Sequence, residues 1–280
     1  MTLTVEAAGA LTTVQDRGRP GLAHLGVPRA GPLDRPAAEL ANRLVGNGLD
    51  AALLEVTWGG LVMSTDIGTW VAVTGAPVPL DVDAAARGLH AAGWLPAGGR
   101  LRLGAPTAGV RSYVAVAGGL DVAPVLGSRS TDTLAWVGPA RVRDGARLPV
   151  GTPAGPPAAL DTPRPPAPGP LRVTPGPRAD WFAADALERL CAAAYVVGEA
   201  SNRVGLRLEG APPERIRDDE LPSEGMVLGA VQVPPDGLPV VLLADHPPTG
   251  GYPVLAVVHP DDLWQCGQAR PGEVLWFVRG

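Results

Sequence analysis

Arginines and glycines gather near the N-terminus. Between positions 16 and 43 there are five Arg and three acidic residues, in a chain whose net charge is −5. This first cluster runs from Thr12 to Asp34 and includes Gln15-Asp16-Arg17-Gly18-Arg19. A guanidinium fork grips carboxylate or phosphate, and glycine lets backbone N–H groups approach an anion. The cluster therefore favours binding of a small anion by Arg17 or Arg19, and the alternative is a surface loop held by ion pairs to Asp16.

A second cluster of polar residues lies far along the chain. Asp245 follows the apolar run Val240–Leu243, and the turn Thr249-Gly250-Gly251-Tyr252 comes soon after it. Glu224 and Gln232 precede it. A carboxylate and a glycine turn at a strand end form the kind of rigid loop on which sites are built. The alternative is a hairpin connection in which Asp245 bonds the turn backbone.

A third group places Arg203 and Arg207 in an otherwise apolar stretch. Side chains alternate along a strand, so Arg203, Gly205 and Arg207 are expected to share one face. That face is either the wall of a site or the solvent side.

Several familiar chemistries have no residues to support them. The chain contains no lysine, which excludes a Schiff-base lysine, a Walker-A lysine and a biotin carrier on this chain. It has no GxGxxG, GxSxG or HExxH motif, and its four histidines are scattered without metal-ligand spacing. The net negative charge argues against non-specific nucleic-acid binding. No metal site is predicted.

Short strands are expected to position these clusters. The 37 Gly and 32 Pro residues favour turns, and apolar β-branched runs ended by turn residues predict strands. The clearest are Trp70–Val73, Tyr113–Val116, Val240–Leu243, Val254–Val258 and Val274–Val278. The fold class predicted is mainly β with a few short helices.

Three helices are predicted. The first spans about Arg35 to Val45, with Asp34 as its cap, Pro36 in its first turn and Gly46 after its end. The second runs from about Trp181 to Ala193, and a short third begins near Asp261.

A proline-rich seam divides the chain. Nine of the 22 residues from Pro149 to Pro170 are proline, which fixes φ and removes a ladder donor. We therefore expect an N-terminal β lobe at residues 1–150, a linker at 151–170 and a C-terminal lobe at 171–280.

The expected location is the cytoplasm. The first ten residues carry Glu6 and no basic segment, and no apolar stretch reaches the roughly 18 residues of a membrane helix. Cys191 and Cys266 are far apart and are interpreted as unpaired thiols in a reducing compartment.

Eight stretches, in order along the chain, carry a resemblance to a known family. They are Thr13–Gly21, Gly26–Pro28, Ala41–Asn47, Leu54–Thr57, Ala117–Val122, Leu126–Thr131, Gly205–Gly210 and Thr249–Pro253. Together they resemble the KipA-like family, which includes the C subunit of bacterial ATP-dependent 5-oxoprolinase and is also called allophanate hydrolase subunit 2 or biotin-dependent carboxyltransferase subunit. The family often has Gln-Thr-Thr where Pro247-Pro248-Thr249 stands here.

The resemblance implies two cyclophilin-like β-barrel lobes in a hetero-oligomer with two other proteins, a KipI-like subunit and a LamB/YcsF-like subunit. This chain and the KipI-like subunit would use ATP, with Mg²⁺, to activate the lactam of 5-oxo-L-proline. The LamB/YcsF-like subunit would then open the ring to L-glutamate. The ATP site would be shared with the KipI-like partner.

The two clusters suit such a substrate. Arg17 or Arg19 would bind its carboxylate, and Asp245 or Glu224 would accept the ring N–H. Thr249, Gly250 and Gly251 would cradle a phosphate with backbone donors. Gln15, Asp16, Asp34 and Gln232 would add contacts, and Tyr252 would form an apolar wall in one cleft shared by both clusters.

Two other functions fit the same family. One is a carboxyltransferase like the matching part of urea carboxylase, which would receive carboxybiotin from another protein. The other is a regulatory protein that antagonises a histidine-kinase inhibitor.

Overall fold

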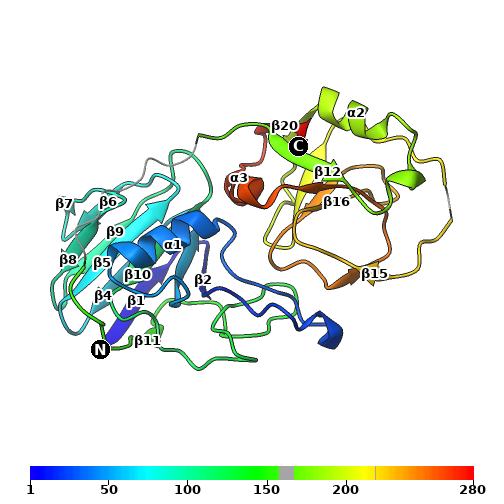
Figure 1. Ribbon diagram of the computed structural model, residues 1–280. Coiled ribbons are helices and arrows are strands. Elements are labelled where there is room, and N and C mark those ends of the chain that lie inside the picture. The colour runs from blue at the N-terminus through cyan, green and yellow to red at the C-terminus, as the bar shows by residue number, and fades with distance from the viewer. Residues whose placement is uncertain (158–166, 218) are drawn as a thin grey trace. The chain divides into compact units, whose positions relative to one another are not determined.

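The computed structural model describes residues 1–157, 167–217 and 219–280. The chain forms two compact units (Figure 1). The first unit comprises Met1–Arg19, Ala30–Asp132 and Trp136–Pro165, and the second comprises Pro20–Arg29, Thr133–Ala135 and Pro166–Gly280. Two short segments of the first 150 residues thus belong to the second unit, which the proline-rich seam does not indicate. Part of the predicted linker, residues 158–166, lies outside the described residues.

The first unit contains two antiparallel sheets. The six-stranded sheet has the order β11-β1-β4-β9-β6-β7, and the five-stranded sheet has the order β2-β3-β10-β5-β8. The six strands are β1 (Thr2–Ala8), β4 (Leu61–Thr65), β6 (Leu80–Val82), β7 (Ala85–Ala86), β9 (Arg100–Leu103) and β11 (Arg147–Pro149). The five are β2 (Leu11–Gln15), β3 (Leu53–Thr57), β5 (Thr69–Gly75), β8 (Ala92–Leu95) and β10 (Arg111–Val116).

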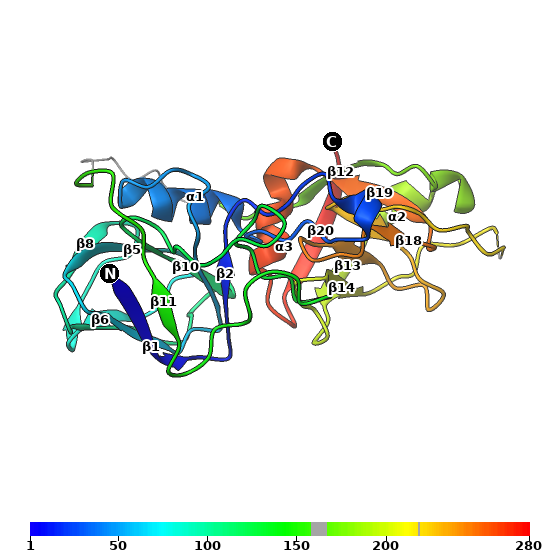
Figure 2. The ribbon, with the colours of Figure 1, turned by 90° about the horizontal axis from the view of Figure 1, so that it is seen from below.

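Strands β3 and β10 are buried at every position because both faces of their sheet are covered. Leu54, Val56, Val114 and Val116 pack with residues of the other sheet in the main core. Side chains on the opposite face, including Tyr113, pack against helix α1 (Arg35–Leu44). Figure 2 shows this helix lying along the sheet. Two layers of strands and one helix therefore enclose this core.

Helix α1 confirms the predicted capping pattern. The Asp34 carboxylate accepts a hydrogen bond of 3.0 Å from the Ala37 backbone N–H, and proline lies in the first turn. The cap satisfies one of the backbone donors that a helix start leaves unpaired. Asp34 is itself buried, so the helix begins at a fixed point of the unit.

The second unit is built on a closed barrel of seven strands, in the order β12-β19-β16-β17-β14-β13-β20. All neighbouring pairs are antiparallel except β12 and β20, which are parallel. The strands are β12 (Leu171–Pro175), β13 (Ala194–Val197), β14 (Gly205–Glu209), β16 (Ala230–Gln232), β17 (Val240–Leu242), β19 (Val254–Val258) and β20 (Val274–Arg279). A separate two-stranded ribbon pairs β15 (Glu224–Gly225) with β18 (Thr249–Gly250).

The helices of the second unit are short. The segment predicted as one helix from Trp181 to Ala193 is instead a 3-10 turn, η2 (Ala179–Trp181), followed by α2 (Ala186–Ala192). The reason is that Phe182 is extended and forms an isolated bridge with Arg215. The helix predicted near Asp261 is confirmed as η3 (Pro260–Asp262) leading into α3 (Leu263–Gln268). The remaining turn is η1 (Ala23–Leu25).

The predicted fold class, mainly β with a few short helices, is confirmed. Short strands dominate because the apolar runs are only a few residues long and end at turn residues. In the described parts of the chain, no helix has both the length and the apolar character needed to cross a membrane.

Candidate functional site

Asp16, predicted as a substrate contact, is the centre of a hydrogen-bond network within the first unit. Its carboxylate accepts from the Ser128 hydroxyl at 2.5 Å, the Ser130 hydroxyl at 2.7 Å and the Arg129 backbone N–H at 2.5 Å. The Gly18 N–H donates to it as well, at 2.9 Å. Since both carboxylate oxygens are occupied, Asp16 holds the 128–130 loop against its own loop.

Gln15 and Arg19 belong to the same hydrogen-bond network. The buried Gln15 amide donates to the Thr131 carbonyl at 2.9 Å, and its oxygen accepts from the Gly31 N–H at 3.1 Å. The buried Arg19 guanidinium donates to the Ser130 carbonyl. These partners lie inside the protein, so the geometry favours a structural role for both residues.

Gly138 shows how closely the residues of this network pack. Its φ is +104°, and a Cβ placed there would lie 2.1 Å from the Ser130 carbonyl oxygen and 2.7 Å from an Arg19 nitrogen. Only glycine allows the chain to pass at this point.

Arg17 differs from its neighbours because it faces solvent. Its side chain is 71% exposed, and its ion pair with Asp50 is long, at 3.8 Å. Such a pair contributes little to stability. Of the predicted residues in this cluster, Arg17 is therefore the one presented to an external ligand.

A buried polar network in the first unit was missed from the sequence. The Glu55 carboxylate accepts from the Tyr113 hydroxyl at 2.9 Å and from the Leu33 N–H at 3.0 Å, and Arg111 lies 3.6 Å away. Burial raises the pKa of the Tyr113 phenol well above its usual range, with the Glu55 charge adding to the effect. The available signal was a single Glu within the apolar strand around Leu54 and Val56.

Asp245, predicted as catalytic, lies in the interior of the second unit. Arg203 binds it through two bonds, Nε to Oδ2 at 2.8 Å and Nη2 to Oδ1 at 3.0 Å. Thr133 adds its backbone N–H at 2.9 Å and its hydroxyl at 2.7 Å. This pattern occupies both carboxylate oxygens, so in this geometry Asp245 has a structural role. The expectation that Arg203 and Arg207 share a face was wrong, because β14 begins only at Gly205 and Arg203 turns inward while Arg207 is exposed.

His246 follows Asp245 and is also buried. One ring nitrogen, Nδ1, lies 2.8 Å from the Pro247 carbonyl oxygen, to which it donates as Nδ1–H. Burial lowers the pKa of this imidazole, so His246 is neutral at pH 7.

The remaining predicted residues lie in the second unit, several of them in or next to the β15–β18 ribbon. Glu224 forms an ion pair with Arg178, and Gln232 ends β16 in a half-buried position. Thr249 and Gly250 are extended and paired with Glu224 and Gly225. A phosphate-binding nest needs alternating right- and left-handed backbone, which Thr249–Gly251 do not have. The backbone here therefore does not form the predicted phosphate cradle.

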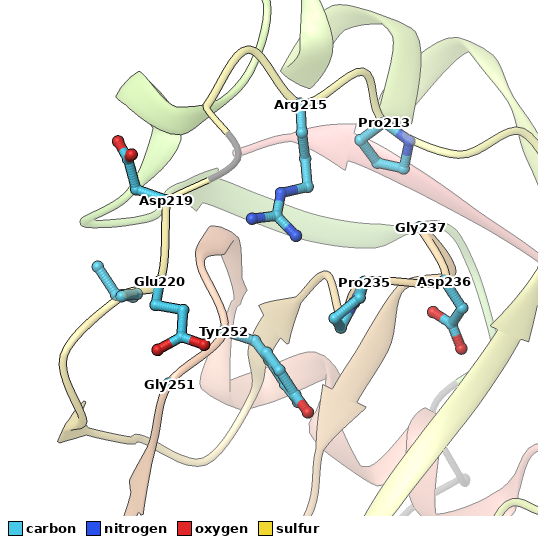
Figure 3. Close-up of a pocket in the computed structure, with 10 residues that line it drawn as sticks. Pro213, Arg215, Asp219, Glu220, Pro235, Asp236, Gly237, Gly251 and Tyr252 are labelled. Carbon is cyan, nitrogen blue, oxygen red and sulfur yellow. The ribbon is translucent and has the colours of Figure 1, made fainter.

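A pocket of about 740 Å³ opens beside this ribbon (Figure 3). Gly251 and Tyr252 line it, as two of the predicted residues. Prolines form much of the apolar lining, and the polar lining comes from one arginine and three acids. The residues lining it are Pro213, Arg215, Asp219, Glu220, Leu221, Pro235, Asp236, Gly237, Gly251 and Tyr252.

The charged residues of this pocket carry no sequence motif, which is why they were missed. Arg215 is partly buried, and Asp219, Glu220 and Asp236 are exposed. Tyr252 is 43% exposed, so its ring offers an open apolar surface beside these charges. Small-molecule sites usually combine an apolar lining with a few polar groups, and this pocket is richer in charged groups than that. In the described part of the chain, no group of three or more His, Cys, Asp or Glu side chains is arranged to hold a metal ion.

The chain was compared with curated proteins. It is 38% identical to the C subunit of 5-oxoprolinase from Escherichia coli (strain K12) over 290 residues, which cover 99% of this chain and 91% of that protein. It is 32% identical to the urea amidolyase of Saccharomyces cerevisiae over 99% of this chain but only 16% of that protein. The match to urea amidolyase is thus confined to a small part of a much longer protein.

Solved structures also include proteins that are similar to this chain over nearly its full length. The crystal structure of TTHA0988 superposes with a TM-score of 0.89 at 41% identity, covering 99% of this chain and 55% of that chain. The Kluyveromyces lactis urea carboxylase superposes with a TM-score of 0.91 at 31% identity, covering 27% of that chain. This chain therefore spans about half the length of TTHA0988.

A family model described as carboxyltransferase domain, subdomain A and B, matches residues 25–279. The match includes most of the first unit and nearly all of the second. With the near full-length similarity to a 5-oxoprolinase C subunit, it confirms the resemblance drawn from the sequence stretches. The chain belongs to the carboxyltransferase domain family of subdomains A and B.

Proposed function

We propose that this chain is one subunit of an ATP-dependent 5-oxoprolinase. It would act with a KipI-like subunit to activate the lactam of 5-oxo-L-proline, and a LamB/YcsF-like subunit would complete hydrolysis to L-glutamate. The observation that supports this most is the 38% identity to a 5-oxoprolinase C subunit over 91% of that protein. A second 5-oxoprolinase C subunit, from Haemophilus influenzae, is 29% identical over 87% of its length.

The chemistry explains why several subunits and ATP are needed. Opening an unstrained lactam is uphill near neutral pH, so hydrolysis needs coupling to a second, favourable reaction. In the proposed complex, ATP supplies the driving force and the partner subunits supply further groups. This chain would contribute a binding surface for the substrate.

The described residues do not favour a complete nucleotide site on this chain. The backbone of Thr249–Gly251 forms no phosphate nest, and the adjacent pocket has three carboxylates against one guanidinium. Such a pocket repels a polyphosphate. We therefore assign most of the ATP and Mg²⁺ binding to the KipI-like partner.

The second candidate is a carboxyltransferase component. The matches to urea amidolyases and to the Kluyveromyces lactis urea carboxylase favour it. Because this chain contains no lysine, carboxybiotin would have to be presented by another protein. The substrate would then be urea or another small amide.

One experiment separates these candidates. The chain is expressed in its natural host background with an affinity tag, the co-purifying subunits are retained, and ATP hydrolysis is measured with 5-oxo-L-proline or with urea and bicarbonate. We expect 5-oxoproline-dependent ATP hydrolysis with release of L-glutamate. Urea-dependent turnover, together with a co-purifying biotinylated protein, would instead establish the carboxyltransferase. The proposed complex places the chain in the cytoplasm.

A further inference from the structure

We propose that Arg215 is the carboxylate-binding residue of the pocket shown in Figure 3, and that the pocket takes a small ligand with one carboxylate and an N–H donor. As applied to 5-oxo-L-proline, the inference rests on the proposed function. It replaces Arg17 and Arg19 as the residues expected to bind that carboxylate. It also selects between substrate classes, because urea carries no carboxylate.

The Arg215 guanidinium has N–H donors that the described residues leave without a close acceptor. Its Nε is buried and has no hydrogen-bond partner in the residues that the structure describes. One Nη2 bond to the Arg217 carbonyl is long, at 3.4 Å. A guanidinium carries five N–H donors, and a buried donor left unpaired destabilises the protein. A carboxylate accepting two parallel bonds would satisfy this side chain.

The position of Arg215 is fixed by the fold. Its backbone forms a bridge with Phe182, whose side chain lies in the interior of the second unit. Figure 3 shows its guanidinium projecting into the pocket, across from Tyr252 and Pro235. The group is thus aimed at the space that a ligand would fill.

Three other arginines of this unit have acidic partners. Arg203 binds Asp245 in the interior, Arg178 binds Glu224 and Arg172 binds Asp262. Arg215 differs from these three arginines, since among the described residues no carboxylate forms an ion pair with it. It is the cation of the pocket that remains available to an anionic ligand.

The acidic rim restricts the kind of anion. Asp219, Glu220 and Asp236 surround one arginine, so the lining residues have a net charge of −2. Inorganic phosphate or a nucleotide would meet this charge with two or more negative charges of its own. A single carboxylate beside an N–H group fits better, because Arg215 would bind the carboxylate and a rim oxygen would accept the N–H.

The apolar lining fits the centre of the same ligand. The exposed ring of Tyr252 and the rings of Pro213 and Pro235 present carbon surface between the charged groups. A five-membered lactam has two methylenes in this position, with the N–H and the carboxylate on one side. L-5-Oxoproline therefore matches all three kinds of lining group.

The test is a binding titration on the full chain, followed by isothermal calorimetry or NMR, with L-5-oxoproline, 2-pyrrolidinone and urea as probes. 2-Pyrrolidinone has the same ring without the carboxylate. We expect Arg215→Gln to weaken L-5-oxoproline binding by about 10- to 150-fold, the loss of a hydrogen bond to a charged group. The same change should leave 2-pyrrolidinone binding unaltered, and Arg215→Lys should restore part of the L-5-oxoproline affinity.

Arg207→Gln is the matched control, because Arg207 is an exposed arginine of the same unit that does not line the pocket. It should bind L-5-oxoproline as the unaltered chain does. Circular dichroism and the melting temperature check that each variant is folded. Equal L-5-oxoproline affinity in Arg215→Gln and Arg207→Gln would overturn the inference.

The KM for 5-oxoproline in the assembled complex separates this inference from the proposed function. A complex that turns over 5-oxoproline with the same KM for Arg215→Gln and unaltered chain overturns the Arg215 assignment and leaves the function standing. An unaltered complex that never hydrolyses ATP in response to 5-oxoproline overturns the function. If L-5-oxoproline nevertheless binds the chain and Arg215→Gln weakens it, the pocket assignment holds.

Discussion

Arg203 and Asp245 form a two-bond ion pair whose side chains are 1% and 0% exposed. The pair lies in the second unit, where Thr133 donates two further hydrogen bonds to the same carboxylate. Removing water from two charges is costly, and this cost is met only where the geometry is good and the remaining acceptors are satisfied. Both conditions hold here, so the geometry favours a structural role for Asp245, which the sequence predicts as catalytic.

We expect Asp245→Ala to lower the free energy of unfolding by about 3–5 kcal/mol, because it leaves the Arg203 charge buried without its partner. Urea denaturation measures this change. Asp236→Ala, an exposed acid of the same unit, is the control and should change it by less than about 1 kcal/mol. If Asp245→Ala folds with normal stability but the assembled complex loses all activity, the catalytic interpretation is right.

Arg17 and Arg19 are two residues apart, but replacing each by alanine should change the stability of the protein by very different amounts. Arg19→Ala removes a buried donor to Ser130 and should destabilise by about 1–3 kcal/mol. Arg17→Ala removes a solvent-exposed pair and should stay within about 0.5 kcal/mol. Thermal unfolding of both variants measures this contrast. Equal losses of stability would contradict the structural role of the buried Arg19 side chain.

The stability should depend on pH through Asp262. Two hydrogen bonds of 2.8 Å from the Arg172 side chain lower the pKa of this carboxyl below its usual value. A depressed folded-state pKa means that the stabilisation is complete above the unfolded pKa and is lost as the pH falls through the folded pKa. Asp262→Asn should therefore cost about 1–3 kcal/mol at pH 7 and much less at an acidic pH at which the folded-state carboxyl is protonated.

Urea denaturation of Asp262→Asn and of the unaltered chain at both pH values measures this difference. Asp261→Asn is the matched control, since Asp261 is exposed. A constant difference between Asp262→Asn and the unaltered chain across the acidic range would show that the ion pair does not titrate in the folded state.

We expect the purified chain to show no 5-oxoproline-dependent ATP hydrolysis, because the backbone of Thr249–Gly251 forms no phosphate nest and the adjacent pocket is acidic. Adding the KipI-like and LamB/YcsF-like subunits should restore it. Their association should be obligate, and such interfaces bury upwards of about 2,000 Å². Size-exclusion chromatography and a coupled ATPase assay test both points, and full turnover by the single chain would contradict the proposal.

The elements were predictable where local rules decide them. Apolar runs ended by turn residues predicted β10 and β19, and an Asp-x-Pro start predicted α1. The helix expected from Trp181 failed because Phe182 pairs with Arg215, far along the chain. No local pattern contains such a pairing.

The candidate site was harder to predict than the fold. The sequence predicts a substrate contact at Asp16 and a catalytic residue at Asp245, but Ser128 and Thr133, which bind these carboxylates, are each more than a hundred residues away. Only folding shows whether a carboxylate is already occupied. Arg215 is the opposite case, since no motif in the sequence indicates it and its proposed role depends on the surrounding pocket.

The position of Thr133 determines which fragments of this protein can fold independently. The proline-rich seam looks like a natural place to divide the gene, yet Thr133 lies before it and Asp245 after it. The segment Pro20–Arg29 also belongs to the unit that follows the seam. A fragment starting at residue 171 would lack these pieces and would retain a buried carboxylate short of two donors. Truncation and domain exchange should therefore keep both parts of the chain together, because the part after the seam does not carry all the residues of its own interior.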